Sequence, residues 1–122
     1  MLNKEAALHQ FWNGFGIPAY EENTIPKDAK LPYITYEVIT DSLSDYTTAL
    51  TAQIWYKSNS WVEINEKSHT ISQALNPGAR LVCSDGYILL YRGSPFAQNR
   101  VDPSDNTIKG KLININADFI TQ

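Results

Sequence analysis

The fold is decided by residues 31–75, LPYITYEVITDSLSDYTTALTAQIWYKSNSWVEINEKSHTISQAL. Side chains alternate between two faces over Tyr33–Thr40 and again over Ala49–Lys57, which is the period of a β-strand. Asp41–Thr47 lies between them and is rich in side chains that bond to nearby backbone, so it is predicted to be a loop. A connection this short makes the two strands an antiparallel pair.

Amphipathic helices are predicted at two places. Ser60 and Glu63 have the S-x-x-E spacing of a capping box, and apolar residues recur at helical spacing after them. Residues 3–15 form the other helix, with Asn3 as its N-cap. The apolar face of this first helix consists of Leu8, Phe11, Trp12 and Phe15.

Turn formers and alternation locate the remaining elements. Strands are predicted at residues 80–84, 87–92 and 107–120, and loops at residues 18–31 and 93–106. In the last strand the apolar residues change parity between Leu112 and Ile113, and a shift of this kind indicates a β-bulge.

The element order is then α-β-β-α-β-β-β, with mostly short links. This order predicts an α+β fold, in which a single antiparallel sheet of four to five strands has two helices packed mainly on one face. A chain of 122 residues has room for one core, so residues 1–122 are predicted to form one domain.

Composition narrows the class of partner and the compartment. Ten basic and 13 acidic residues give a net charge of −3, and the basic residues are scattered. This distribution argues against nucleic acid as the main partner, because phosphate binding needs a concentrated basic face. The lone cysteine, Cys83, suits a reducing compartment, and neither a secretory signal nor a membrane span is recognised. We therefore expect a protein that is made and kept in a cytosol.

Few side chains suggest catalysis or metal binding. His9 and His69 each lack a partner at the spacing that ligates a metal from one helix face, and Cys83 is expected to be a small buried hydrophobe. Asp102 and Asp105 resemble half of a calcium loop, but no terminal acid follows and a turn explains them better. No catalytic residue, cofactor or metal site is predicted, although two carboxylates brought together by folding would still allow acid–base chemistry.

Aromatic residues on the predicted strands are Tyr33, Trp55, Tyr87 and Tyr91. Several of them must lie on the sheet face that the helices leave open. Such a face is either a solvated surface or a subunit contact, because Tyr and Trp are enriched in protein interfaces.

Three local patterns and their order point to a known family. After a helix and a long loop, an L-P-Y-x-x-Y strand starts at Leu31 and an A-x-I-W-Y strand starts at Ala52, and a capped helix follows. The chain closes with D-P-x-D-N-x-I from Asp102 and a final strand. Through this pattern, most of the chain resembles the tail terminator proteins of long-tailed bacteriophages, which are also called tail completion or tail-to-head joining proteins.

The resemblance implies a structural protein without catalytic residues or a cofactor. Members of that family cap the finished tail tube as a ring, usually a hexamer, and offer a surface to the head connector. The implied partners are therefore further copies of the chain, the tail tube protein and the head connector protein. The implied location is the tail of the virion, after synthesis in the cytoplasm of the bacterial host.

Contacts are expected at the loops Asp41–Thr47 and Gly93–Asn106, because long loops on a rigid sheet are where contacts are usually placed. The candidate interface residues are Asp41, Ser44, Asp45, Tyr46, Phe96, Arg100, Asp102 and Asp105. Two alternatives stay open: a small-ligand-binding or enzymatic α+β domain, and a different head–tail adaptor or minor virion protein.

Overall fold

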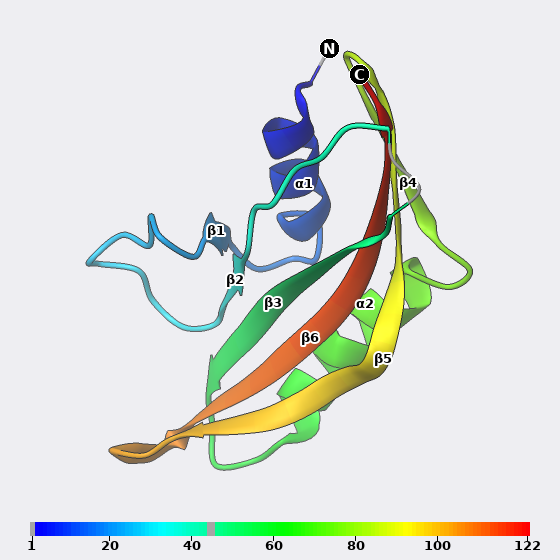
Figure 1. Cartoon of the computed structure of the whole chain (residues 1–122). Coiled ribbons are helices and arrows are strands. Elements are labelled where there is room, and N and C mark those ends of the chain that lie inside the picture. Colours follow the sequence, from blue (N-terminus) through cyan, green and yellow to red (C-terminus); the bar gives the residue numbers. More distant parts are fainter. Residues whose placement is uncertain (1, 44–45) are drawn as a thin grey trace.

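The computed structural model describes residues 2–43 and 46–122, and in these residues it has two helices and a single curled sheet of six strands (Figure 1). The helices are α1 (Lys4–Trp12) and α2 (Val62–Ala74). The strands are β1 (Ala19–Glu21), β2 (Tyr33–Tyr36), β3 (Thr48–Lys57), β4 (Ala79–Cys83), β5 (Gly86–Asp102) and β6 (Asp105–Thr121). The predicted α+β class is confirmed.

The strands lie in the order β1-β2-β3-β6-β5-β4, and among the described strands β1 alone is parallel to its neighbour. The prediction of four to five antiparallel strands was therefore wrong, because the sheet is mixed and has six. The additional strand lies in the predicted loop 18–31, where Ala19–Glu21 pairs with Ile34–Tyr36. A strand of three residues is too short to show a period, so the sequence pattern could not reveal it.

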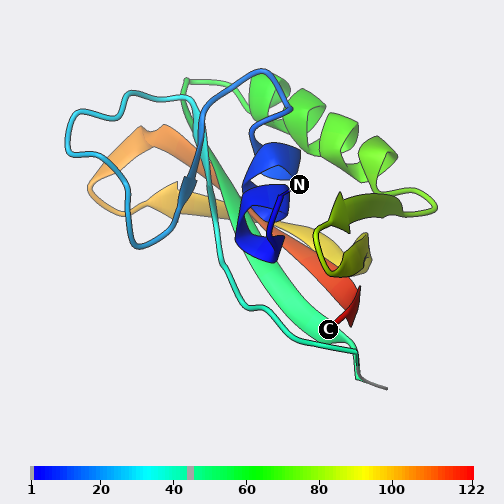
Figure 2. The same cartoon turned by 90° about the horizontal axis from the view of Figure 1, so that it is seen from above.

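Both helices cover the same face of the sheet (Figure 2). On β3 and β6, alternate residues such as Ile54 and Ile115 point toward the helices and are buried. Trp12 of α1 and Ile71 of α2 complete the same apolar core. Burying a large apolar side chain of this kind stabilises a fold by about 1.5–3 kcal/mol. No helix of the described residues lies over the opposite face of the sheet.

A long hairpin formed by β5 and β6 lies at the centre of the sheet. β5 and β6 have 17 residues each and are joined by a tight turn at Pro103 and Ser104. The predicted loop Gly93–Asn106 was therefore wrong, because all but the turn belongs to these two strands. Beyond the reach of β4 the hairpin continues as an arm, which we define as residues 96–109 (Figure 1). The base of the arm still contacts β3 and the core, through the pair Lys57–Ile108 and through Phe96, and its tip projects beyond them.

The predicted bulge in the last strand was also wrong. β3 pairs with β6 over ten positions without a shift of register, so β6 is regular at Leu112 and Ile113. The irregularity lies instead in β5, where Arg92 pairs with Ile115 and the next paired residue, Ala97, pairs with Ile113. Between these two pairs β5 advances by five residues and β6 by two, so β5 has a bulge. Pro95 lies inside this bulge, where the lack of an N–H group costs the ladder nothing.

The two helices start differently. The Asn3 side chain accepts a hydrogen bond from the Ala6 N–H at 2.8 Å, so the predicted N-cap of α1 is confirmed. The capping box predicted for α2 was wrong, because Trp61 occupies the N-cap position without a side-chain bond. The Ser60 hydroxyl accepts instead from the Val62 N–H at 3.1 Å. One donor of the first turn is thus satisfied without the reciprocal bond that a capping box requires.

Candidate interaction surfaces

The face of the sheet opposite the helices, here called the open face, is built from the residues that alternate with the core. On β3 and β6, Gln53 and Asn114 are examples, and both are half-buried. The four aromatic residues singled out from the sequence all lie on this face and are half-buried, which confirms their expected placement. Polar and aromatic side chains thus share a surface that does not belong to the apolar core.

Trp55 anchors the part of the open face nearest the arm. Its indole lies over Gly110, where an added Cβ would come within 2.7 Å of Trp55 Cζ3. The Trp55 indole N–H donates to the Thr35 hydroxyl at 3.3 Å. Tyr20 and Tyr33 continue the aromatic surface toward β1, with ring centroids 5.7 Å apart and planes at 72°. These contacts fix the aromatic groups in place, as a contact surface requires.

A hydrogen-bonded triangle lies at the other end of the open face. The Thr47 hydroxyl donates to Asp118 Oδ1 at 2.8 Å, and the Tyr91 hydroxyl donates to the same oxygen at 3.3 Å. The Thr47 and Tyr91 hydroxyls are 3.1 Å apart. Nearby, the Arg80 guanidinium lies 4.3 Å from the centre of the Tyr87 ring. This part of the surface is polar and charged, but its groups are paired with one another.

The bulge of β5 forms a hollow of about 320 Å³ on the open face. The Asn114 amide donates to the Pro95 carbonyl at 3.0 Å. The polar side chains of the lining come from Thr51, Ser94, Gln98, Asn114 and Asn116. The lining residues carry amides, hydroxyls and apolar groups, and none of them is ionisable. The hollow is therefore suited to accept a side chain or small polar group by hydrogen bonding, and it offers no group for proton transfer near neutral pH.

A second hollow of about 260 Å³ lies beside α2, on the covered side of the sheet. It is lined by Tyr56, Glu63, Glu66, Lys67 and Thr70. Burial raises the pKa of Tyr56, and the carboxylates of Glu63 and Glu66 add to this effect. Lys67 donates to the Phe15 carbonyl at 2.5 Å, which ties α2 to the chain that follows α1.

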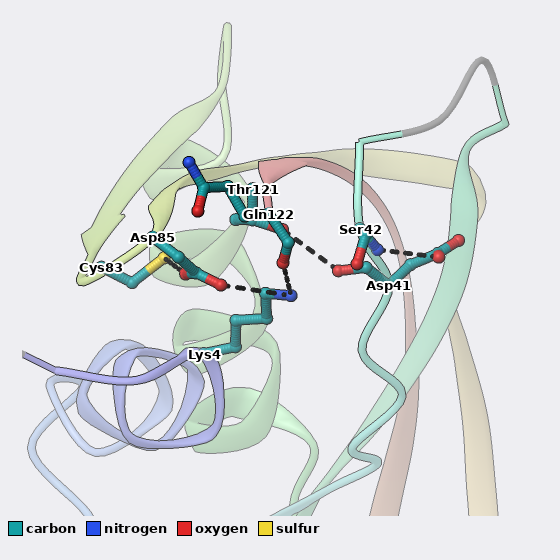
Figure 3. Close-up of polar contacts among 7 residues, drawn as sticks. All are labelled: Lys4, Asp41, Ser42, Cys83, Asp85, Thr121 and Gln122. Carbon is teal, nitrogen blue, oxygen red and sulfur yellow. Dashed lines mark hydrogen bonds and ion pairs between the residues drawn. The ribbon is translucent and has the colours of Figure 1, made fainter.

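Both chain ends meet at the C-terminal end of β6 (Figure 3). Lys4 Nζ lies 3.4 Å from the Asp85 carboxylate and donates to the Gln122 carbonyl at 3.0 Å. The Cys83 thiol donates to the same carboxylate at 3.4 Å. Desolvation alone would raise the pKa of Asp85, but the Cys83 and Lys4 contacts outweigh it and hold the pKa below its ordinary value.

The predicted loop Asp41–Thr47 lies at this end of the sheet. β2 ends at Tyr36, four residues earlier than predicted, and the chain then runs to the C-terminal end of β6. There the Leu43 N–H donates to the Thr121 carbonyl at 2.8 Å, and the Thr121 hydroxyl donates to the Asp41 carbonyl at 3.1 Å (Figure 3). The loop is thus attached to the end of the sheet.

Two of the candidate interface residues, Ser44 and Asp45, lie outside the described residues. Asp41 and Tyr46 are exposed, the latter at 81%. The other candidates lie in the arm, where Arg100 is exposed and Phe96 packs partly against the core. The structure does not bring Asp41 together with Asp102 and Asp105, because they lie at opposite ends of β6, which is roughly 50 Å long at about 3.3 Å per residue. Phe96 lies between these ends, next to the residue that pairs with Ile113.

The tip of the arm is a double turn. Asp102 Oδ1 accepts hydrogen bonds from the Ser104 N–H at 2.8 Å and hydroxyl at 2.7 Å. Asp105 Oδ1 accepts from the Thr107 N–H at 2.9 Å and hydroxyl at 2.6 Å. These bonds lower the pKa of both carboxyls. The prediction that these residues form a turn is confirmed.

The residues weighed for chemistry have structural contacts. Cys83 is buried as expected, and burial, followed by its bond to Asp85, raises the pKa of its thiol. His9 Nδ1 lies 2.8 Å from the Tyr36 hydroxyl. Within residues 2–43 and 46–122, no group of three His, Cys, Asp or Glu side chains is placed to hold a metal ion.

The sequence did not reveal the outer edge of β5. β4 pairs only with Gly86–Leu90, so from Tyr91 to Asp102 the described part of the chain covers β5 on one side alone. A signal for this edge was present, because a predicted last strand of fourteen residues needs a partner longer than a predicted strand of six. Interruption by Gly93 and Pro95 concealed the continuation of that partner.

Comparison with known protein families and with curated proteins finds no match to this chain. In the described segments, neither helix has the length and apolar character needed to cross a membrane.

Proposed function

We propose that this chain is a structural subunit without catalytic activity that caps the tail tube of a long-tailed bacteriophage as a ring of six copies. In this role it would join the tube to the head connector and remain in the virion tail. The proposal starts from the resemblance carried by Leu31–Leu75. The structural observation that supports it most is the position of candidate contact residues at opposite ends of one sheet.

A protein that joins two assemblies needs two surfaces that face away from each other. Tyr46 at one end of the sheet and the turn from Asp102 to Asp105 at the other meet this requirement, because β6 runs between them as a regular strand. The open face lies along the same strand and supplies a third surface, with the half-buried Trp55 and Tyr33 characteristic of subunit contacts. A ring of identical chains needs a contact between two different surfaces of this kind.

The decisive experiment is assembly of virus particles with and without this chain. Without it, we expect tail tubes that exceed their normal length and heads that do not join them. Supplying the chain in trans should restore both the length and the joining. Tubes can be measured and joined particles counted by electron microscopy.

The result also separates the proposal from a different head–tail adaptor. Loss of an adaptor would leave tails of normal length that fail to join heads, whereas loss of a terminator changes the tail length itself. Normal tails joined to normal heads in the absence of the chain would exclude both roles.

A small-ligand-binding domain is the second candidate, and the hollow of about 320 Å³ at the β5 bulge is the observation in its favour. This volume is at the lower limit of ordinary ligand pockets, about 300–1,000 Å³. The hollow also lies on the open face, where a neighbouring subunit would cover it. Asn114→Leu tests the difference: it would abolish the binding of a ligand, whereas in the structural role it would weaken only a protein contact.

A further inference from the structure

Two stretches of backbone with an unpaired side carry side chains of opposite charge, Arg100 in the first and Asp41 in the second. The first is the outer edge of β5 in the arm, from Gln98 to Val101, which pairs with β6 on its inner side only. The second is the segment 37–43 that connects β2 to β3, on the opposite side of the sheet (Figure 1). Unpaired backbone of this kind readily adds a further strand, so a folded protein either protects it or uses it.

The segment 37–43 is attached through Glu37, Asp41 and Leu43, and Val38 packs partly against the core. The Asp41 carbonyl accepts from the Thr121 hydroxyl. The Glu37 N–H donates to the Thr51 carbonyl at 2.9 Å, and the Leu43 N–H donates to Thr121. Between these points the backbone N–H groups of residues 38–41 make no hydrogen bond with described residues. Ile39 and Leu43 are exposed at 43% and 71%, which is unusual for large apolar side chains along one short segment.

The charged residues around the two stretches differ. Residues 37–47 contain Glu37, Asp41 and Asp45 and no basic residue. The arm contains two basic residues, Arg100 and Lys109, and two acidic ones, Asp102 and Asp105, and Lys109 donates to the Asn106 carbonyl. The two acidic residues are engaged in the turns at the tip of the arm, whereas exposed Arg100 has no hydrogen bond or ion pair with the described residues.

Lys4 and Asp85 form the one ion pair found in the described part of the chain. Asp41 and Arg100 thus lie on different sides of the sheet, and neither forms an ion pair with the described residues. Complementary charges on opposite sides of the same chain favour contact between copies, with each charge meeting its counterpart on the next molecule.

We propose that the outer edge of β5 from Gln98 to Val101 binds residues 38–42 of a second copy of this chain as an added strand. The contact brings Asp41 of one copy close to Arg100 of the next, and it repeats from copy to copy. This inference rests on the proposed ring and identifies the two surfaces that close it. It applies to the free protein in solution.

Charge reversal on either edge tests the contact. Arg100→Glu and Asp41→Arg should each weaken self-association by at least about tenfold, because like charges then face each other. Lys27→Glu and Glu66→Arg are matched controls, since they change the net charge by the same amounts outside both edges, and they should leave self-association unchanged. The association is measured by analytical ultracentrifugation and native mass spectrometry.

Mixing the two variants gives the sharpest result. Where the variants alternate, the acidic arm of the Arg100→Glu chain faces the basic segment of the Asp41→Arg chain, and the unchanged arm faces the unchanged segment. Every contact then joins opposite charges. An equimolar mixture should therefore form oligomers with an even number of subunits and equal amounts of both chains, although neither variant forms them alone. Recovery in the mixture also shows that the single variants were folded.

The outcomes separate this inference from the proposed function. Rings that form equally well with Arg100→Glu and Asp41→Arg would overturn the inference and leave the ring in place. A wild-type chain that stays monomeric at about 1 mM would also overturn it, since association that weak is not self-assembly in solution. Tail length in particles assembled without the chain tests the proposed function separately.

Discussion

Ile54 and Gln53 are neighbours on β3, yet they belong to different regions of the molecule. Ile54 points toward the helices and is fully buried, whereas Gln53 lies on the open face and is half-buried. The same contrast repeats along β6, where Ile113 is buried and Asn114 is not. One sheet therefore has a dry apolar face and a face of amides, hydroxyls and aromatic rings.

The difference between the two faces separates the residues that stabilise the fold from the residues that are available for contact with another protein. The covered face provides the apolar burial that stabilises a chain of this size. The open face contributes less to stability, but it holds Trp55 and Tyr33 in fixed positions and leaves an unpaired edge beside them. Substitutions on the two faces should accordingly affect different measurements.

The largest expected effect is on the covered face. Ile54→Ala should lower the free energy of unfolding by about 2–5 kcal/mol, because it leaves a cavity in the apolar core, where Ile54 is fully buried. Gln53→Ala, one residue away, should change it by about 0.5 kcal/mol or less. Chemical denaturation of both variants measures the contrast, and equal losses would show that the two faces do not differ in this way.

A second expected effect lies where the open face is itself closely packed. In Gly110→Ala the new Cβ would meet Trp55 Cζ3 at 2.7 Å and Arg100 Cβ at 3.2 Å. Such overpacking costs about 1–3 kcal/mol of unfolding free energy. The loss should be smaller in a Trp55→Leu background, because the shorter side chain vacates the space above Gly110. A loss of the same size in both backgrounds would show that the indole is not the obstacle.

The comparison of the two faces also explains what the sequence could predict. The covered face was predictable, because alternation over residues 33–57 and helical spacing after Ser60 are direct consequences of burial on one side. β1 was not predictable, because three residues show no period and its parallel partner is set by tertiary packing. The arm was missed because Gly93 and Pro95 read as a loop, although here they form a bulge inside a strand.

The candidate site shows the same division. Residue types identified the aromatic surface correctly, because Tyr and Trp on strands must occupy a face. The hollow at the bulge depends on a register that no local pattern fixes, since the pairing of β5 shifts between Arg92 and Ala97. The two stretches with an unpaired side also required the order of the strands, which places the segment after Glu37 and the arm on opposite sides.

A smaller effect is expected in the hydrogen-bonded triangle on the open face. Tyr91→Phe removes the hydroxyl that lies 3.1 Å from Thr47 and 3.3 Å from Asp118. The expected loss is about 0.5–1 kcal/mol, because the group is partly exposed and water replaces part of each bond. Combining it with Thr47→Val in a double-mutant cycle should give less than the sum of the two losses. Strict additivity would show that the three groups act independently.

The smallest effect concerns the tip of the arm and depends on pH. The hydrogen bonds from Ser104 hold the pKa of Asp102 below its ordinary value in the folded protein. A lowered pKa in the folded state means that the stabilisation is present above the unfolded pKa, about 3.9. It is lost as the pH falls through the folded pKa.

Thermal unfolding between pH 6 and about pH 2 should therefore fall less steeply for Asp102→Asn than for the wild type, because the amide does not titrate. Ser104→Ala should reduce the difference, since it removes the hydroxyl that contributes most to the shift. The turn lies far from the covered face, so Ile54→Ala should leave the pH dependence of this step unchanged. If Asp102→Asn and the wild type lose stability in parallel, the turn at the tip of the arm is not held by the ionised carboxylate.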